Sequence, residues 1–267
     1  PVGVAGLGSG IIQVSVGVWH ACAVTSDNHV RCWGSNQFGQ LGNGFVSGAN
    51  PLIVAALDSA TNLPLTDIVM VAVGGDHTCA LTKTGGVKCW GGNYAGQLGD
   101  GTRIQRTEAV DVVGPPSGVV YVSAGDSHTC AVMATGGVKC WGANYAGQLG
   151  NGTTTDSLVP VDVTLPPGKT AVAVSAGNAF TCALLNDGSV VCWGSNSSGQ
   201  LGNGGAGGGS TPVSVLGLGG PATLVTAGGW QACALLADGT VKCWGANSSG
   251  QLGDGTTTNS GTPVNVI

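Results

Sequence analysis

Residues 128–150 read HTCAVMATGGVKCWGANYAGQLG, and this phrase occurs in five versions along the 267-residue chain. Each copy has a cysteine, nine further residues, Cys-Trp-Gly and then Gly-Gln-Leu-Gly. Successive second cysteines lie 57, 51, 52 and 51 residues apart, at Cys32, Cys89, Cys140, Cys192 and Cys243. A repeat near fifty residues indicates an array of one supersecondary unit, and the pattern here predicts β-propeller blades.

The third copy predicts four short antiparallel strands, over residues 119–125, 128–133, 138–142 and 158–163. Apolar and polar residues alternate in them, and glycine-rich turns separate them. No helix pattern with caps occurs. We therefore expect an all-β fold, in which residues 1–267 form one propeller domain of five four-stranded blades. An insert at about 46–66 explains the single 57-residue spacing.

The ten cysteines form five pairs with identical spacing. Folding the second hairpin about Thr84 places Cys79 opposite Cys89 and Leu81 opposite Val87. Opposed residues of a non-hydrogen-bonded pair have Cα atoms about 4.5 Å apart, which suits a disulfide. The same pairing predicts one bridge in every blade, at Cys22–Cys32, Cys79–Cys89, Cys130–Cys140, Cys182–Cys192 and Cys233–Cys243. Five pairs of buried free thiols in a reducing cell are the alternative.

Zinc is a further alternative, because His20, His77 and His128 each precede a cysteine by two residues and share its strand face. The fourth and fifth copies keep both cysteines but carry Phe180 and Gln231 at the histidine position. A cysteine pair that persists without the third ligand does not need a metal, so we expect none. The Asp-Gly-Thr runs at residues 100–102 and 254–256 are interpreted as turns, because each lacks an acidic calcium-ligand set.

The composition narrows the classes of function. Charged residues make up 8% of the chain, and 13 acidic residues outnumber 8 basic ones that are scattered along it. Nucleic-acid binding needs a basic stripe, so we expect no such partner. No apolar run reaches the length of a membrane span. The chain also opens without a basic and apolar leader, which indicates a mature form or an excised region. With disulfides, these features favour a secreted or cell-surface protein.

The repeats resemble the regulator of chromosome condensation repeat family. That family carries Gly-x-x-His-x-x-Ala-Leu, Gly-x-Val-x-x-Trp-Gly, Asn-x-x-Gly-Gln-Leu-Gly and a Pro-Val strand, and all five copies follow this pattern, with Phe180 and Gln231 at the histidine position of the last two. The resemblance implies a β-propeller, usually of seven blades, and the cysteine pair looks like the secreted bacterial branch. The family includes a chromatin-bound exchange factor and a secreted β-lactamase inhibitor. The second implies a secreted propeller that acts by presenting a protein-binding face.

Five blades depart from the seven usual in that family. Residues 1–7 match residues 263–267 in phase, so the ends could latch together. We expect a closed five-bladed ring, and the alternative is part of a longer array.

Comparison among the copies points to a variable face. A glycine stands five residues before each first cysteine, and the two positions after it differ from blade to blade. Trp19 and Trp230 occupy these positions in the first and last blades, which would be neighbours in a closed ring. The predicted binding residues are Trp19, His20, Asp76, His77, Ser127, His128, Trp230 and Gln231. The alternative is that the two tryptophans fill the seam between the terminal blades.

A second variable site follows each Cys-Trp-Gly: Phe38 stands there in the first blade, Tyr94 and Tyr145 stand one residue earlier in phase, and the last two blades have Ser197 and Ser248 at the tyrosine position. These aromatic residues predict another surface patch or simply cover the loops. No serine–histidine–aspartate set or carboxylate pair recurs, so we expect neither catalysis nor a cofactor. The sequence favours a non-enzymatic binding scaffold for a protein or cell-surface glycan. A structural subunit that assembles with itself in an extracellular polymer is the alternative.

Overall fold

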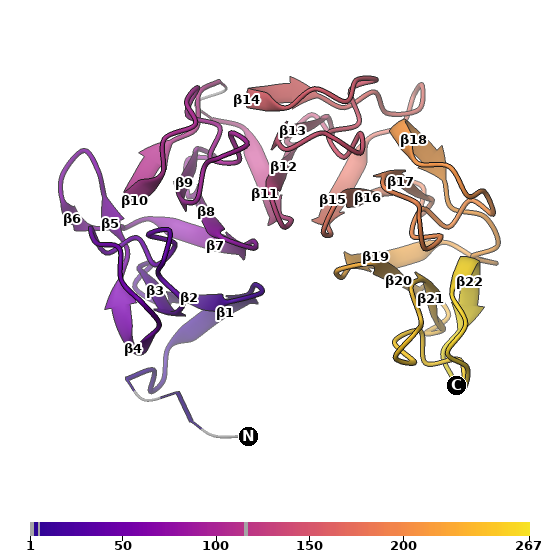
Figure 1. Cartoon of the computed structure of the whole chain (residues 1–267), viewed down its shortest axis with the longest axis horizontal. Helices are drawn as coiled ribbons and strands as arrows, with labels where there is room; N and C mark the ends of the chain where they lie inside the picture. The colour runs from indigo at the N-terminus through magenta and orange to yellow at the C-terminus, as the bar shows by residue number, and fades with distance from the viewer. Residues whose placement is uncertain (1–2, 5, 115–116) are drawn as a thin grey trace.

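The computed structural model describes residues 3–4, 6–114 and 117–267, which form five antiparallel sheets arranged around a centre (Figure 1). The first sheet holds β1 (Ile11–Val16), β2 (His20–Thr25), β3 (Val30–Gly34) and β4 (Asn50–Ala55). The second holds β7 (Ile68–Val73), β8 (His77–Thr82), β9 (Val87–Gly91) and β10 (Arg106–Asp111). The third holds β11 (Val119–Ala124), β12 (His128–Met133), β13 (Val138–Gly142) and β14 (Ser157–Asp162). The fourth holds β15 (Ala171–Ala176), β16 (Phe180–Leu185), β17 (Val190–Gly194) and β18 (Gly209–Ser214). The fifth holds β19 (Ala222–Ala227), β20 (Gln231–Leu236), β21 (Val241–Gly245) and β22 (Ser260–Asn265).

Each sheet is a propeller blade, with its strands in chain order from the centre outward. The first strands β1, β7, β11, β15 and β19 surround the centre, and the fourth strands lie on the outer rim (Figure 1). The expected all-β propeller of five four-stranded blades is therefore confirmed. No helix of the described ranges has the length and apolarity that a membrane crossing requires.

The predicted insert contains regular structure. Its first part includes β4, and β5 (Leu57–Asp58) and β6 (Leu63–Pro64) then form a hairpin beside the second blade. Asp58 pairs with Ala109 of β10 in parallel register. The Lys88 ammonium joins the two elements, at 3.1 Å from Asp58 and 2.8 Å from Asp111. The insert thus completes the first blade and widens the second.

The five predicted disulfides are present, one in each blade. The paired cysteines stand directly opposite each other in the hairpin of the second and third strands, with Cα atoms 4.0–4.1 Å apart. Nine of the ten half-cystines are buried, whereas Cys233 in the last blade is half-buried. The strand alternation that predicted the bridges also places them in the blade cores.

The Gly-Gln-Leu-Gly loops lock each blade to the next one. Gly42 has φ of +74°, and a Cβ atom there would lie 2.7 Å from Nε1 of Trp90. Trp90 Nε1 donates a hydrogen bond of 2.9 Å to the Gln40 carbonyl of the first blade. Thr78 Oγ1 donates to the same carbonyl, also at 2.9 Å. Equivalent tryptophan contacts recur at the other three contacts between blades, which we call blade junctions.

A buried histidine completes three of the four junctions. His20, His77 and His128 place Nε2 at 2.7–2.9 Å from the hydroxyl of Thr78, Thr129 and Thr181, respectively. Each threonine hydroxyl has one proton, which it donates to a glutamine carbonyl of the preceding blade. Nε2 must therefore be the donor to the hydroxyl oxygen, so the imidazole is the neutral Nε2–H tautomer.

The fourth junction uses an apolar pair instead. Phe180 replaces the histidine, Ala232 replaces the threonine, and both belong to the same buried cluster. Gly177 accommodates the phenyl ring, since a Cβ atom there would lie 2.3 Å from Phe180. Gly74 accommodates the His77 ring in the same way. Histidine–threonine and phenylalanine–alanine are thus two versions of one contact.

The expectation of a closed ring is wrong, because the five blades form an open arc (Figure 1). Neighbouring inner strands pack in the order β1, β7, β11, β15 and β19, and the described part of β1 does not pack in this way on β19. Val14 is 52% exposed, whereas the equivalent Val71 is 1% exposed. The proposed latch falls partly on residues outside the described ranges, and residues 6–10 form no strand.

Candidate interaction face

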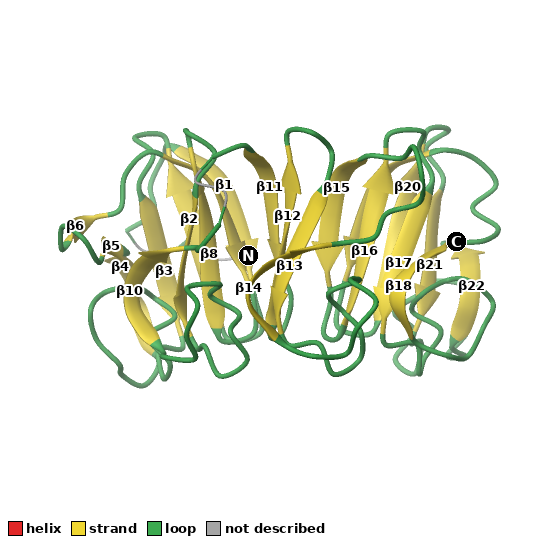
Figure 2. Ribbon diagram, turned by 90° about the horizontal axis from the view of Figure 1, so that it is seen from above, coloured by secondary structure: helices red, strands yellow, loops and turns green. Residues whose placement is uncertain are grey.

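Both variable positions found in the sequence lie on one face of the arc. Because β2 is antiparallel to β1 and to β3, the loops after the first and third strands emerge at the same end of a blade. Figure 2 shows such loops gathered at the ends of the strands. We call this end the loop face. It carries Trp19, Phe38, Tyr94, Tyr145 and Trp230, which are 65%, 36%, 53%, 66% and 42% exposed.

The structure separates the predicted binding residues into exposed and buried ones. Trp19 and Trp230 are exposed, and Asp76 and Gln231 are half-buried. The three histidines are 0–4% exposed and Ser127 is 7% exposed. The histidines are held inside the blade junctions, so we leave them out of the proposed contact surface.

The two tryptophans do not form the expected pair. They belong to blades on opposite sides of the opening in the arc (Figure 1). Their exposure also argues against the alternative that they fill a seam between the first and last blades. Trp19 and Trp230 therefore stand at the two ends of the loop face.

The second and third blades bring acidic and aromatic residues together in a way that the sequence did not reveal. Tyr94 Oη contacts Ser127 Oγ across the blade junction, and Ser127 Oγ donates to Asp126 at 3.1 Å. We call Asp76, Tyr94, Asp126, Ser127 and Tyr145 the tyrosine–aspartate patch. Burial raises the pKa of Tyr94, and the charges of Asp126 and Asp76 raise it further.

The patch belongs to only two blades, so the propeller fold does not require it. At the equivalent positions the fourth blade has Asn178, Ala179 and Ser197. The fifth has Gly229, Trp230 and Ser248. Both blades nevertheless adopt the same four-stranded structure. Phe38 of the first blade extends the patch, because it and Asp76 both lie near Gly92.

Asp76 is held at a cost to stability. Burial raises its pKa first, and the charge of Asp126 raises that pKa further. The pKa of Asp76 is higher in the folded chain than in the unfolded chain. The ionised carboxylate therefore lowers the free energy of unfolding, and this destabilisation is complete above the folded-state pKa. It disappears at lower pH, where the carboxyl group is protonated in both states. Asp76→Asn is therefore expected to raise the unfolding midpoint at pH 7, and the gain should shrink as the pH falls towards 4.

Asp162→Asn is the matched control, since that exposed carboxylate pairs with Lys139 at 2.7 Å. It should give no gain in the midpoint. Equal midpoints for wild type and Asp76→Asn at pH 7 in thermal or denaturant unfolding would contradict the proposed destabilisation by the ionised Asp76 carboxylate.

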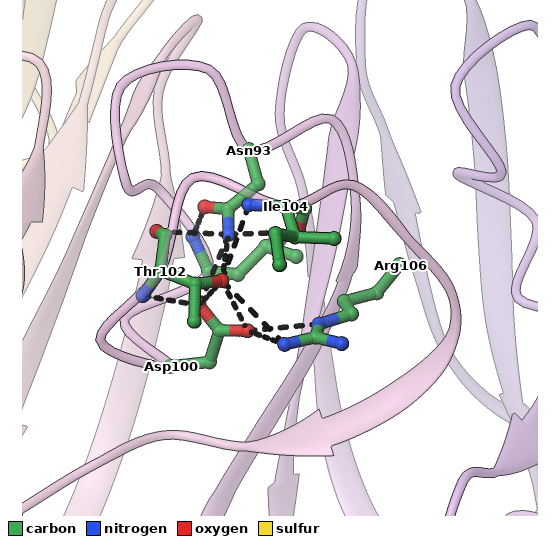
Figure 3. Close-up of polar contacts among 6 residues, drawn as sticks. Asn93, Asp100, Thr102, Ile104 and Arg106 are labelled. Carbon is green, nitrogen blue, oxygen red and sulfur yellow. Dashed lines mark hydrogen bonds and ion pairs between the residues drawn. The ribbon is translucent and has the colours of Figure 1, made fainter.

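The Asp-Gly-Thr turn of the second blade is filled by internal contacts (Figure 3). Asn93 Nδ2 donates to Asp100 and to the carbonyls of Thr102 and Ile104 at 3.0–3.1 Å. Arg106 pairs with Asp100 at 2.7 Å. Burial alone would raise the pKa of Asp100, but the hydrogen bonds, led by Arg106, outweigh it and lower that pKa. The side chains of this turn therefore hold the loop together through hydrogen bonds and an ion pair. No group of three or more metal-binding side chains occurs in the described residues.

A central opening lies among the inner strands of all five blades and holds about 280 Å³. Small residues line it, because neighbouring blades approach closely there. A Cβ atom on Gly125 would lie 2.4 Å from the Gly177 carbonyl oxygen, and one on Gly74 would lie 2.4 Å from that of Gly125. Asp126 is the one carboxylate among the lining residues.

Comparison with known proteins gives the same picture for the whole chain. The family model described as RCC1-like domain matches residues 1–267. The chain is 37% identical over 198 residues to the human probable E3 ubiquitin-protein ligase HERC3. The matched segment covers 73% of this chain and 18% of that protein. It is 33% identical to the ultraviolet-B receptor UVR8 of Arabidopsis thaliana, over 97% of this chain and 58% of the receptor. The chain thus spans less than two thirds of these relatives.

Solved structures agree with this assignment. Human WBSCR16 superimposes with a TM-score of 0.84 at 25% identity, covering 96% of this chain and 67% of that chain. Yeast RCC1 (Prp20), solved bound to Kap60, gives a TM-score of 0.72 at 19% identity, covering 96% and 75%. From the repeats, the blades and the match over residues 1–267, the chain belongs to the family of RCC1-like domains.

Proposed function

We propose that this chain is a secreted, non-enzymatic scaffold that binds a protein partner through its loop face. The observation that carries the proposal is the tyrosine–aspartate patch, in which Tyr94 and Tyr145 are more than half exposed beside Asp76 and Asp126. Tyrosine supplies much of the binding energy at protein interfaces, and paired carboxylates favour a partner with lysine or arginine.

Two further observations support this function. Propellers of this family bind proteins: yeast RCC1 (Prp20) was solved in complex with Kap60, and the yeast protein has binding properties towards Gsp1p and histones. Disulfides are typical of oxidising compartments, and each of the five blades has one. A secreted or cell-surface location fits both the disulfides and the low charge content.

The chain provides its own substitutions for testing the patch. Tyr94→Ser with Tyr145→Ser copies the serines that the fourth and fifth blades carry at the same position. We expect unchanged unfolding, because those blades fold with serine. We also expect at least a tenfold loss of affinity, since exposed aromatic anchors often contribute more than 1 kcal/mol each.

The measurement compares protein capture from the medium and surface of the source cells by wild type, the double serine variant and Leu52→Ser. Leu52 is 71% exposed on the outer strand β4, away from the patch, so its variant should bind as wild type does. Equal capture by all three proteins would contradict the proposal. Captured material that survives protease treatment but not glycosidases would identify a glycan ligand and overturn the choice of a protein.

A structural subunit of an extracellular assembly is the second candidate. Both ends of the arc have uncovered apolar faces, where Val16 is 72% exposed on the first blade and Leu235 is 37% exposed on the last. Exposed sheet faces of this kind favour contact with another chain.

A further inference from the structure

Three sequons of the form Asn-x-Ser/Thr occur in the chain, and this sequence is the acceptor for N-linked glycans in secreted proteins. They begin at Asn151, Asn196 and Asn247. Each lies in the loop between the third and fourth strands of a blade, in the third, fourth and fifth blades respectively. The surroundings of the three asparagines differ in a way that separates one of them from the other two.

The asparagines of the fourth and fifth blades hold their loops together from inside. Asn196 and Asn247 are 3% and 0% exposed. Nδ2 of Asn247 donates to the Asp254 carboxylate and to the carbonyls of Thr256 and Thr258, each at 3.1 Å. Nδ2 of Asn196 makes the corresponding three contacts in its own loop at 2.8–3.3 Å. Both side-chain nitrogens are thus fully used and out of reach.

A glycan is incompatible with either of these two positions. In N-glycosylation, Nδ2 gives up one proton and bonds to C1 of the first sugar. The bond from C1 to the lipid diphosphate breaks, and the diphosphate leaves with the electron pair. The linked nitrogen keeps one N–H where it had two. At Asn196 or Asn247 the loop would lose a buried donor and would have to open around a sugar ring, so the blade could not close.

Asn151 uses its side chain differently. It is half-buried, and its Oδ1 accepts hydrogen bonds from the Thr153 N–H at 3.1 Å, from Thr153 Oγ1 at 2.8 Å and from Asn144 Nδ2 at 3.4 Å. No hydrogen bond among the described residues uses its Nδ2. That nitrogen is also not one of the buried polar atoms left without a partner, so solvent reaches it.

The turn around Asn151 does not need the amide nitrogen. The equivalent residues of the second and fifth blades are Asp100 and Asp254, each also followed by Gly-Thr. Asp254 Oδ1 accepts from Asn247 and Thr256, as Asn151 Oδ1 accepts from the matching residues of its blade. A carboxylate without any N–H therefore forms the same turn. The nitrogen of Asn151 is free to carry a substituent without loss of a fold contact.

We propose that Asn151 is an N-glycosylation site of the folded chain and that Asn196 and Asn247 stay unmodified. The donor substrate is a lipid-linked oligosaccharide of a secretory pathway. Gly152 N–H donates to the Ser210 carbonyl of β18 at 2.9 Å, so the glycan emerges from the loop face between the third and fourth blades. This modification goes beyond the proposed binding function and does not depend on it.

Secretion of the full chain from an animal cell line supplies both the oligosaccharide and an oxidising compartment. Glycopeptide mass spectrometry of the secreted, disulfide-bonded chain then measures the occupancy of each sequon. We expect glycan on Asn151 and none on Asn196 or Asn247. Asn151→Asp copies the aspartates of the second and fifth blades, so it should be secreted equally well and lose all glycan. Secreted chain with an unmodified Asn151, or with glycan on either of the other two asparagines, would overturn the proposal.

Matched controls remove the other two sequons without touching their asparagines. Ser198→Ala and Ser249→Ala copy Ala95 and Ala146, which stand at the same position in the second and third blades. The backbone N–H there donates to a glutamine side chain in all four blades, and the substitution keeps this contact. We expect unchanged secretion and an unchanged glycan mass. A loss of glycan in either variant would contradict the assignment to Asn151.

A second site can be created in the fifth blade. Asp254→Asn completes a sequon with Gly255 and Thr256 in the turn that corresponds to Asn151, and Asp254 is half-buried as Asn151 is. We expect the secreted variant to gain the mass of one further glycan, located at residue 254. A secreted variant with glycan on Asn151 alone would overturn the assignment of the exposed turn as the acceptor.

Discussion

Complete reduction of the disulfides is expected to unfold the chain at room temperature. Each bridge spans a sequence separation of 10, which is worth roughly 2–3 kcal/mol in the loop-entropy picture. Five such bridges contribute about 10–15 kcal/mol, as much as the whole stability of a typical domain. Circular dichroism of the chain refolded with and without a phosphine reductant measures the effect. A reduced chain with the oxidised midpoint would contradict it.

The bridges should also open in a defined order. Cys233 is half-buried on the uncovered side of the last blade, whereas the cysteines of the other four bridges lie inside blades at 0% exposure. Under mild native reduction followed by alkylation and mass spectrometry, Cys233 and Cys243 should be labelled first. The matched comparison is Cys130–Cys140 in the covered third blade, which should be labelled only when the chain unfolds globally.

Acid is expected to destabilise the chain before the carboxylates with lowered pKa values lose their charge. Burial lowers the pKa of His20 to about 4, of His77 to about 3 and of His128 to about 4. Nδ1 of each ring has no protein hydrogen-bond partner in the described structure, so a second proton would create an unpaired buried cation. These folded-state values lie below the unfolded value of about 6.5, so stability is full above pH 6.5 and falls as the pH decreases towards 4.

The expected loss between pH 7 and pH 5 is about 2 kcal/mol for each buried histidine, or about 6 kcal/mol in all. Carboxylates with lowered pKa values, such as Asp100 and Asp254, lose their contribution only at lower pH. Urea denaturation at the two pH values measures the change. His77→Phe with Thr129→Ala copies the natural Phe180–Ala232 pair and should reduce the loss by about a third. The same pH dependence in this variant would contradict the assignment.

The blades and their bridges could be predicted from the sequence because both are local. The hairpin alternation fixes which face Cys79 and Cys89 share, and a short turn fixes their register. The positive φ of Gly42 and its contact with Trp90 likewise follow from the repeated loop. Such features depend on residues close in the chain, so five copies of one pattern were enough to define them.

The arrangement between blades was not predictable in the same way. The opening of the arc depends on the angle between packed sheets, which no single repeat encodes. His20 was predicted to lie on a binding face, but its ring points into Thr78, 58 residues away. The contact between Tyr94 and Ser127 also crosses a junction. Covariation of the histidine and threonine positions among the copies was the signal that could have revealed the junctions.

Oxidative footprinting of the seven tryptophans tests the open arc and its loop face most directly. Trp19 and Trp230 are exposed, Trp33 is half-buried, and the remaining four are 0–1% exposed, at Trp90, Trp141, Trp193 and Trp244. We predict that Trp19 and Trp230 react fastest, that Trp33 follows and that the other four are protected in the oxidised monomer. If Trp33 were as protected as the other four, the outward side of the first blade would be covered, and the open five-bladed arc would be contradicted.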